Sequence, residues 1–323
     1  MKRMPSFLVV AALATVLAAC NASTGGLGSV PSTAPTPSAD PVGPDLTPAP
    51  TPSDEPSSEP SSEPSGEPVA TPTPAASPAG TTIVRAYFVF NGELGVEGLV
   101  PVLRVIPKTT AVAAAAMNVV LSGPTDDEAG AMSSAIPAGS RLLGVTIKNG
   151  VATVDLSTEF DSGGGTASMQ YRLAQVVYTL TQFTTVRSVV FQIEGQTVTV
   201  FGSEGIVLDG PQARADFYDQ LPSIFVDRPA YGAAIGNPGR VAGNSNVFEA
   251  TFHVAIIDAA GKMLVDEVVM ATCGTGCRGT FDVSLRYTVS KGQWGMLRAY
   301  NLSAMDGSPE DVREYPVWLT PAG

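Results

Sequence analysis

The pattern of hydrophobic and polar residues after residue 80 begins with two β-rich runs, at residues 83–90 and 100–106. Apolar residues at helical spacing follow, and Thr109 or Thr110 is placed to cap this first helix, which Gly123-Pro124 ends. A second amphipathic helix is indicated further along by Met169, Leu173, Val176, Val177, Leu180 and Phe183.

Two hairpins accompany the second helix, one on each side of it in sequence. Asn149-Gly150 and Glu194-Gly195 are the dipeptides that two-residue type I′ turns favour. Pairing outward from the turns places two apolar sets on single faces: Val145, Ile147, Ala152, Val154 and Leu156, and then Val189, Phe191, Ile193, Val198 and Val200. The order of elements predicts an α+β domain over residues 81–217, with one mixed sheet backed by two helices.

Seven short apolar runs separated by turn residues fill residues 222–321. They lie at 224–227, 240–243, 247–258, 263–271, 280–288, 294–302 and 312–319. So many short strands without a helix pattern predict an all-β immunoglobulin-like sandwich. Proline at Leu221-Pro222 indicates a short connection between two units that we expect to fold independently.

In the longest of these runs, residues 247–258, apolar and polar residues alternate. We expect Phe248, Ala250, Phe252, Val254 and Ile256 to face the core. The single histidine, His253, is then expected on the outward face. Exposed Met and Trp residues in this domain would mark a binding patch, but the pattern alone does not separate them from core residues.

The first 19 residues have the pattern of a secretion signal peptide. Lys2 and Arg3 precede an apolar run at 7–19, which is shorter than the roughly 20 residues that a membrane-spanning helix needs. Ala18-Ala19-Cys20 resembles the lipobox of bacterial lipoproteins, which implies cleavage before Cys20 and lipidation of its thiol. An ordinary signal peptide with a coincidental Cys20 is the alternative.

Residues 20–80 have the composition of a linker. More than half of the chain's 27 prolines lie between Pro31 and Pro78, and the segment carries several acids and no base. A polar, proline-rich chain buries too little apolar surface to fold, so we expect a disordered linker that holds the folded part away from a membrane. The net charge of −12 argues against nucleic acid as a partner.

The small number of cysteines and the single histidine limit the chemistry that the chain can perform. With Cys20 lipidated, Cys273 and Cys277 remain, and in an oxidising exterior we expect them to form a disulfide. Two cysteines and one histidine are too few for a zinc site, so no metal and no cofactor are expected. Without a Gly-x-Ser-x-Gly elbow or a free thiol, the serine, cysteine and zinc hydrolase mechanisms lack their parts, and the chain is predicted not to be an enzyme.

An acidic cluster, Asp155, Glu159 and Asp161, is the strongest candidate for other chemistry. Such carboxylates serve either glycoside hydrolysis or Ca²⁺ binding. The polar face of the hairpin and the glycine-rich loop at 162–165 favour solvated acids with a structural role.

Several motifs of the first domain together resemble GerMN, the sporulation and spore germination domain. They are LSGP at 121–124, ATVDLSTEF at 152–160, VVYTLTQF at 176–183 and VVFQIEG at 189–195. The resemblance covers most of residues 82–205 and implies an extracytoplasmic envelope domain used for interaction. No catalytic residues come with this family.

The second domain resembles the immunoglobulin-like domain of bacterial spore germination proteins. The motifs are VDRP at 226–229, VAG at 241–243, VFEA at 247–250, Asp258 with Gly261, GTF at 279–281 and SAMDGS at 303–308. Together, the resemblances and the lipobox imply a lipid-anchored, non-catalytic binding or scaffolding lipoprotein on the extracytoplasmic face of the cell membrane. Its expected partners are the membrane, through the lipid anchor, and an envelope protein or peptidoglycan. The alternative is a glycan-active or glycan-binding cell-wall protein that uses the acidic loop residues.

Overall fold

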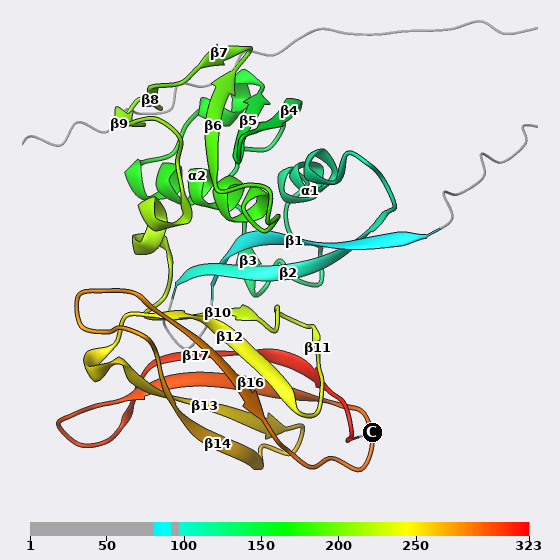
Figure 1. Cartoon of the computed structure of the whole chain (residues 1–323), viewed down its shortest axis with the longest axis vertical. Coiled ribbons are helices and arrows are strands. Elements are labelled where there is room, and N and C mark those ends of the chain that lie inside the picture. Colours follow the sequence, from blue (N-terminus) through cyan, green and yellow to red (C-terminus); the bar gives the residue numbers. More distant parts are fainter. Residues whose placement is uncertain (1–79, 92–96, 323) are drawn as a thin grey trace, which may run out of the picture. The chain divides into compact units, whose positions relative to one another are not determined.

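The computed structural model describes residues 80–91 and 97–322 (Figure 1). The described residues all belong to one compact unit. The predicted signal peptide, the candidate lipidation site Cys20 and all but the last residue of the predicted linker lie outside them. An α+β part is followed by a β-rich part, as predicted.

The α+β part contains two larger sheets, one two-stranded sheet and two α-helices (Figure 1). The first sheet is antiparallel, in the order β2 (Gly98–Pro107), β1 (Thr81–Phe90) and β3 (Met132–Ser133). The second has the order β4 (Leu142–Lys148), β5 (Val151–Leu156), β6 (Ser188–Ile193) and β7 (Gln196–Thr197). It is mixed, because β5 and β6 are parallel and the outer pairs are antiparallel. The prediction of a single sheet is therefore wrong, whereas the mixed sheet and two helices are confirmed.

Both predicted two-residue turns are present. Asn149 and Gly150 have φ of 53° and 86°, and Glu194 and Gly195 have 48° and 78°, as a type I′ turn requires. The first hairpin has the expected register, with Val154 opposite Val145. The second ends early, because β7 stops at Thr197 and the chain forms a separate hairpin. Its strands are β8 (Val200–Phe201) and β9 (Ile206–Val207). Val200 consequently lies 56% exposed instead of sharing the buried face.

The first helix, α1 (Val112–Leu121), begins at a residue that the sequence did not indicate. Its N-cap is Ala111, and no side chain caps it. Thr109 contributes indirectly, because its Oγ1 accepts a hydrogen bond from the Ala111 N–H at 3.1 Å. The helix ends as predicted, with Gly123 at φ 78° just beyond the C-cap.

The second helix, α2 (Thr166–Leu180), is buried far more completely than an amphipathic helix on a surface. Every residue from Leu173 to Leu180 is buried, because the helix contacts β1 of one sheet and β6 of the other. Arg172, only 2% exposed, donates to the carbonyl oxygens of Ala135 (3.2 Å), Phe160 (2.6 Å) and Gly163 (2.9 Å). Its guanidinium thereby attaches the 3-10 turn η1 (Thr158–Asp161) and the loop after it to the helix.

The β-rich part is a sandwich of a three-stranded and a five-stranded sheet. The smaller sheet has the order β10 (Ile224–Arg228), β12 (Gly239–Ser245) and β15 (Gly279–Leu285). The larger one has the order β11 (Ala234–Ile235), β17 (Pro309–Leu319), β16 (Gln293–Leu302), β13 (Thr251–Asp258) and β14 (Met263–Met270). Each of the seven predicted runs contains a strand, and the short β11 is an addition.

One predicted orientation in this part is wrong. Phe248, expected in the core, is 62% exposed, because the 3-10 turn η3 (Phe248–Ala250) precedes β13. Glu249 and Ala250 have positive φ of 55° and 57°, which interrupts the strand alternation. From Phe252 onward the predicted inward positions are buried.

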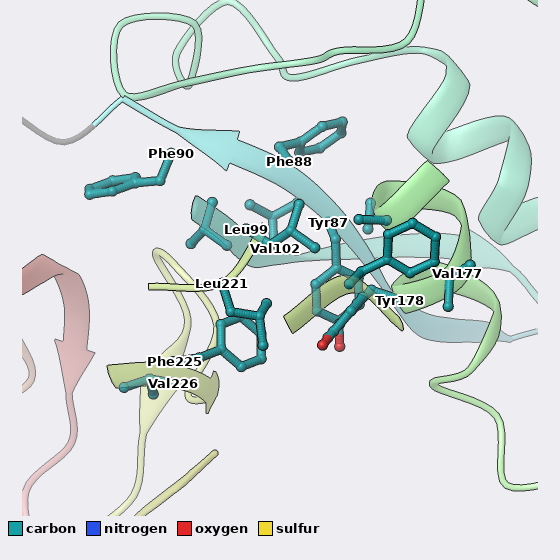
Figure 2. Close-up of a cluster of buried hydrophobic side chains, with 14 of the residues drawn as sticks. Tyr87, Phe88, Phe90, Leu99, Val102, Val177, Tyr178, Leu221, Phe225 and Val226 are labelled. Atoms are coloured by element: carbon teal, nitrogen blue, oxygen red, sulfur yellow. The ribbon is translucent and has the colours of Figure 1, made fainter. Parts of the chain in front are cut away.

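A single buried cluster contains residues of both parts (Figure 2). The ring of Tyr178 on α2 meets that of Phe225 on β10 edge to face, with centroids 5.8 Å apart. The Tyr87 hydroxyl donates to Asp227 at 2.6 Å and accepts from Arg214 at 3.1 Å. The two parts therefore share buried surface, which the expectation of two independently folding units did not include.

Candidate functional site

The three acids of the predicted cluster take up separate structural contacts. Asp155 Oδ1 accepts the Gly195 N–H at 2.9 Å, and Asp161 Oδ1 accepts the Gly202 N–H at 2.7 Å. Glu159 lies 3.6 Å from Arg141, and hydrogen bonding at its carboxylate, most strongly from Ser157, lowers its pKa. No group of three potential metal ligands occurs among residues 80–91 and 97–322. The acidic cluster thus stabilises turns in the part of the chain that is described.

His253 lies on the outer face of the five-stranded sheet, as predicted, in a small side-chain cluster. Its Nδ1 is 3.1 Å from Asp266 Oδ1, and its ring stacks on Tyr300 with centroids 5.0 Å apart. The Tyr300 hydroxyl donates to Asp266 Oδ2 at 2.6 Å. Burial and this carboxylate raise the pKa of Tyr300 to about 12, so the hydroxyl remains a donor at neutral pH.

Cys273 and Cys277 are bonded to each other, with Cα atoms 5.9 Å apart. Thr275 and Gly276 between them have positive φ of 51° and 91°, which turns the chain back on itself. The Thr275 N–H donates to the Val247 carbonyl at 3.0 Å, so the closed loop lies against the segment that precedes η3. The disulfide bond therefore closes the loop between β14 and β15.

Replacing both cysteines with serine should lower the free energy of unfolding by about 2 kcal/mol, the loop-closure entropy of so short a ring. Urea denaturation of the oxidised protein and the double variant measures the difference. A free thiol at either position in oxidised protein, or an unchanged unfolding midpoint, would contradict a structural role for the bond.

A groove of about 430 Å³ lies on the outer face of the five-stranded sheet, and we call it the tryptophan groove. Its lining comes from β16, β17 and the turn between β13 and β14: Ile257, Asp258, Ala259, Gly261, Met263, Trp294, Gly295, Met296, Arg298, Glu314 and Pro316. Strand alternation builds it, because Leu297 and Ala299 point into the core and are fully buried. Trp294, Met296 and Arg298 consequently lie on the opposite face.

Trp294 and Trp318 stand directly opposite each other in the β16–β17 register. Their rings meet edge to face, 5.4 Å between centroids at 83°, and remain 52% and 37% exposed. Gly292 allows this placement, since a Cβ there would lie 2.9 Å from Trp318 Cζ2. Trp294 therefore presents an exposed indole at one end of the groove, and Trp318 packs against it at the border.

A charged pair lies in the same groove, also across the β16–β17 register. Arg298 Nε donates to Glu314 Oε2 at 2.6 Å, and the two side chains are 33% and 15% exposed. Asp258 adds a second carboxylate to the lining, so the groove combines apolar surface with hydrogen-bonding groups and a small negative charge.

The sequence pattern left these tryptophans undecided between core and surface. A signal was present in the strand itself: Arg298 shares the parity of Trp294 and Met296, and a charged residue within a strand marks the solvent face. What the pattern did not indicate is that Glu314 and Pro316, from another strand, complete the groove and that Trp318 packs against Trp294.

The fold is that of an α+β domain joined to an immunoglobulin-like sandwich, and two family matches cover the same regions. Residues 85–199 match the Germane family, described as "Sporulation and spore germination". Residues 223–308 match Gmad2, the "Immunoglobulin-like domain of bacterial spore germination". The chain thus combines a GerMN domain with the immunoglobulin-like domain of bacterial spore germination proteins, as the sequence motifs predicted.

Solved structures similar to the chain include two of the sporulation protein GerM from Bacillus subtilis. Its first GerMN domain is 25% identical (TM-score 0.36, 42% of this chain and 99% of that one), and its tandem GerMN domains are 16% identical (TM-score 0.37, 64% and 62%). A proposed lipoprotein from Clostridium perfringens is 18% identical (TM-score 0.32, 46% and 98%). Among curated proteins, none matches significantly. None of the helices in the described part is long and apolar enough to span a bilayer.

Proposed function

We propose that the protein is a lipid-anchored lipoprotein on the extracytoplasmic face of the cell membrane. In this proposal it acts as a non-catalytic binding or scaffolding module of the spore germination type. The observation that carries the proposal is the order of the parts: Cys20 in a lipobox-like sequence, a proline-rich linker, and then two domains of spore germination families. The Cys273–Cys277 disulfide supports it, because such bonds persist outside the cytoplasm.

The contacts of the polar side chains favour a binding module over an enzyme. A glycosidase needs two carboxylates free to act on the two sides of a glycosidic bond. Asp155 and Asp161 instead accept backbone hydrogen bonds from two turns, and His253 is stacked on Tyr300. The tryptophan groove, in contrast, is lined by an indole, a guanidinium and carboxylates, and side chains of these kinds bind ligands.

Replacing Cys20 with alanine should abolish incorporation of a labelled fatty acid, because the thiol is the acceptor in the proposed lipidation. Metabolic labelling followed by immunoprecipitation measures this, and the matched control is Cys273→Ser with Cys277→Ser, which should keep the label. A Cys20→Ala variant that is labelled as strongly as the unchanged protein would refute the proposed anchor.

A further inference from the structure

We propose that the tryptophan groove is a binding site for an uncharged glycan. One sugar ring would stack on the indole of Trp294, which the ring of Trp318 supports, and its hydroxyls would bond to Arg298 and Glu314. The inference deepens the proposed function and rests on it for location, because an extracytoplasmic site meets cell-wall glycans.

The exposed indoles are the first argument. Trp294 is 52% exposed and Trp318 37%, although tryptophan is the side chain that gains most from burial. The face of an indole ring carries negative electrostatic potential, whereas the C–H face of a pyranose is apolar and slightly positive, so the two surfaces are complementary. The ring of Trp318 meets that of Trp294 edge to face at 83° and so supports its orientation.

The charged pair supplies the second argument. The bond between Arg298 and Glu314 uses Nε and Oε2, and both side chains line the groove. The guanidinium Nη groups remain as donors and Oε1 as an acceptor, a combination that suits vicinal hydroxyl groups, which both donate and accept. Since the pair holds itself in place, binding loses little side-chain freedom.

Charge and size select the ligand class. The groove is lined by one guanidinium, that of Arg298, and two carboxylates, those of Asp258 and Glu314, and the chain carries a net charge of −12, so an anionic polymer is repelled. The predicted linker, rich in acids, is disfavoured as an occupant for the same reason. A volume of about 430 Å³ lies in the range of small-ligand sites, whereas a folded protein partner requires roughly 20–30 residues on each side.

The groove is also preformed. Asp258 Oδ1 accepts the N–H groups of Ala260 and Lys262, both at 2.9 Å, and Gly261 has φ of 79°. This closes the β13–β14 turn that supplies one wall, while the strands β16 and β17 supply the other. A site built on paired strands and a hydrogen-bonded turn needs little ordering when a ligand binds.

The test uses tryptophan fluorescence of the full-length protein, extracted in mild detergent and titrated with the uncharged trisaccharide of N-acetylglucosamine. The chain has only two tryptophans: Trp294 lines the groove and Trp318 contacts its ring, so the signal reports on the groove and its border. We expect a saturable change in emission. Trp294→Ala should weaken binding at least about tenfold, as measured by calorimetry.

Val268→Ala is the matched control. Val268 is 64% exposed on β14 of the same sheet and does not line the groove, so its loss should leave the affinity unchanged. Equal thermal unfolding midpoints for both variants would show that a lost affinity is not a lost fold. Equal affinity of Trp294→Ala and the unchanged protein would place the glycan elsewhere and overturn the assignment.

Two further outcomes would also overturn the inference. One is the absence of saturable binding both to the trisaccharide and to purified peptidoglycan. The other is crosslinking of a photoreactive residue at position 294 to an envelope protein instead of a glycan. Because these measurements use purified or crosslinked protein, they are independent of the fatty acid label on Cys20, so failure of the glycan site and failure of the anchor are distinguishable.

Discussion

Replacing Phe225 with alanine should lower the free energy of unfolding by about 3–5 kcal/mol and destabilise both domains together. Phe225 is fully buried on β10, and its ring contacts that of Tyr178 on α2 at 5.8 Å (Figure 2). The truncation therefore leaves a cavity in the surface that the two domains share. If that surface couples them, neither domain keeps its stability when the cavity forms.

Two optical probes separate the domains in this experiment. Both described α-helices lie in the GerMN domain, so circular dichroism at 222 nm reports mainly on it. Both tryptophans lie in the immunoglobulin-like domain, so fluorescence reports on that one. We expect the two urea transitions to coincide in the unchanged protein and to shift together in Phe225→Ala. Separate midpoints in the unchanged protein would show instead that the domains fold independently.

Phe248→Ala is the matched control for this variant. It removes the same side chain from the same domain at a position that is 62% exposed. Its cost should stay within about 0.5 kcal/mol, as for most surface substitutions. A cost similar to that of Phe225→Ala would mean that burial at the shared surface is not the cause.

Replacing Arg172 with methionine should cost about 3 kcal/mol. Methionine fills much of the volume but leaves the three carbonyl oxygens of Ala135, Phe160 and Gly163 without their charged donor. The bond to Phe160 is buried and the other two are partly buried. A buried acceptor that loses its partner costs about 1–3 kcal/mol, partly exposed acceptors cost less, and better apolar packing offsets part of the sum. Because the donor leaves, the segment around η1 should also exchange its amide hydrogens faster.

The matched control is Arg187→Met. Arg187 is exposed and donates a single hydrogen bond, to the Asn149 carbonyl at 2.8 Å, where water can replace it. We expect a loss below about 1 kcal/mol there. If urea unfolding shows equal losses for Arg172→Met and Arg187→Met, the buried guanidinium does not have the structural role described here.

Local backbone chemistry made much of the fold predictable. Asn149-Gly150 and Glu194-Gly195 specified two turns, because few residue pairs adopt two consecutive positive φ angles, and the first turn set the register of its hairpin. The motifs of both domains were sufficient for the two family resemblances that the family matches bear out. The glycine-rich neighbourhood of the acidic cluster favoured a structural role, and Asp155 and Asp161 accept backbone hydrogen bonds in turns.

What the sequence by itself determined was the type and order of the elements and the pairing of cysteines within one turn, since these depend on residues close together in the chain. Only the tertiary structure decided that α2 contacts two sheets, that Tyr178 and Phe225 share a core, and that Glu314 completes a groove with Trp294 and Arg298. Each of these depends on which strand lies beside which. Alternation along a strand shows which residues share a face, but the layer packed against the strand decides which of its two faces is buried.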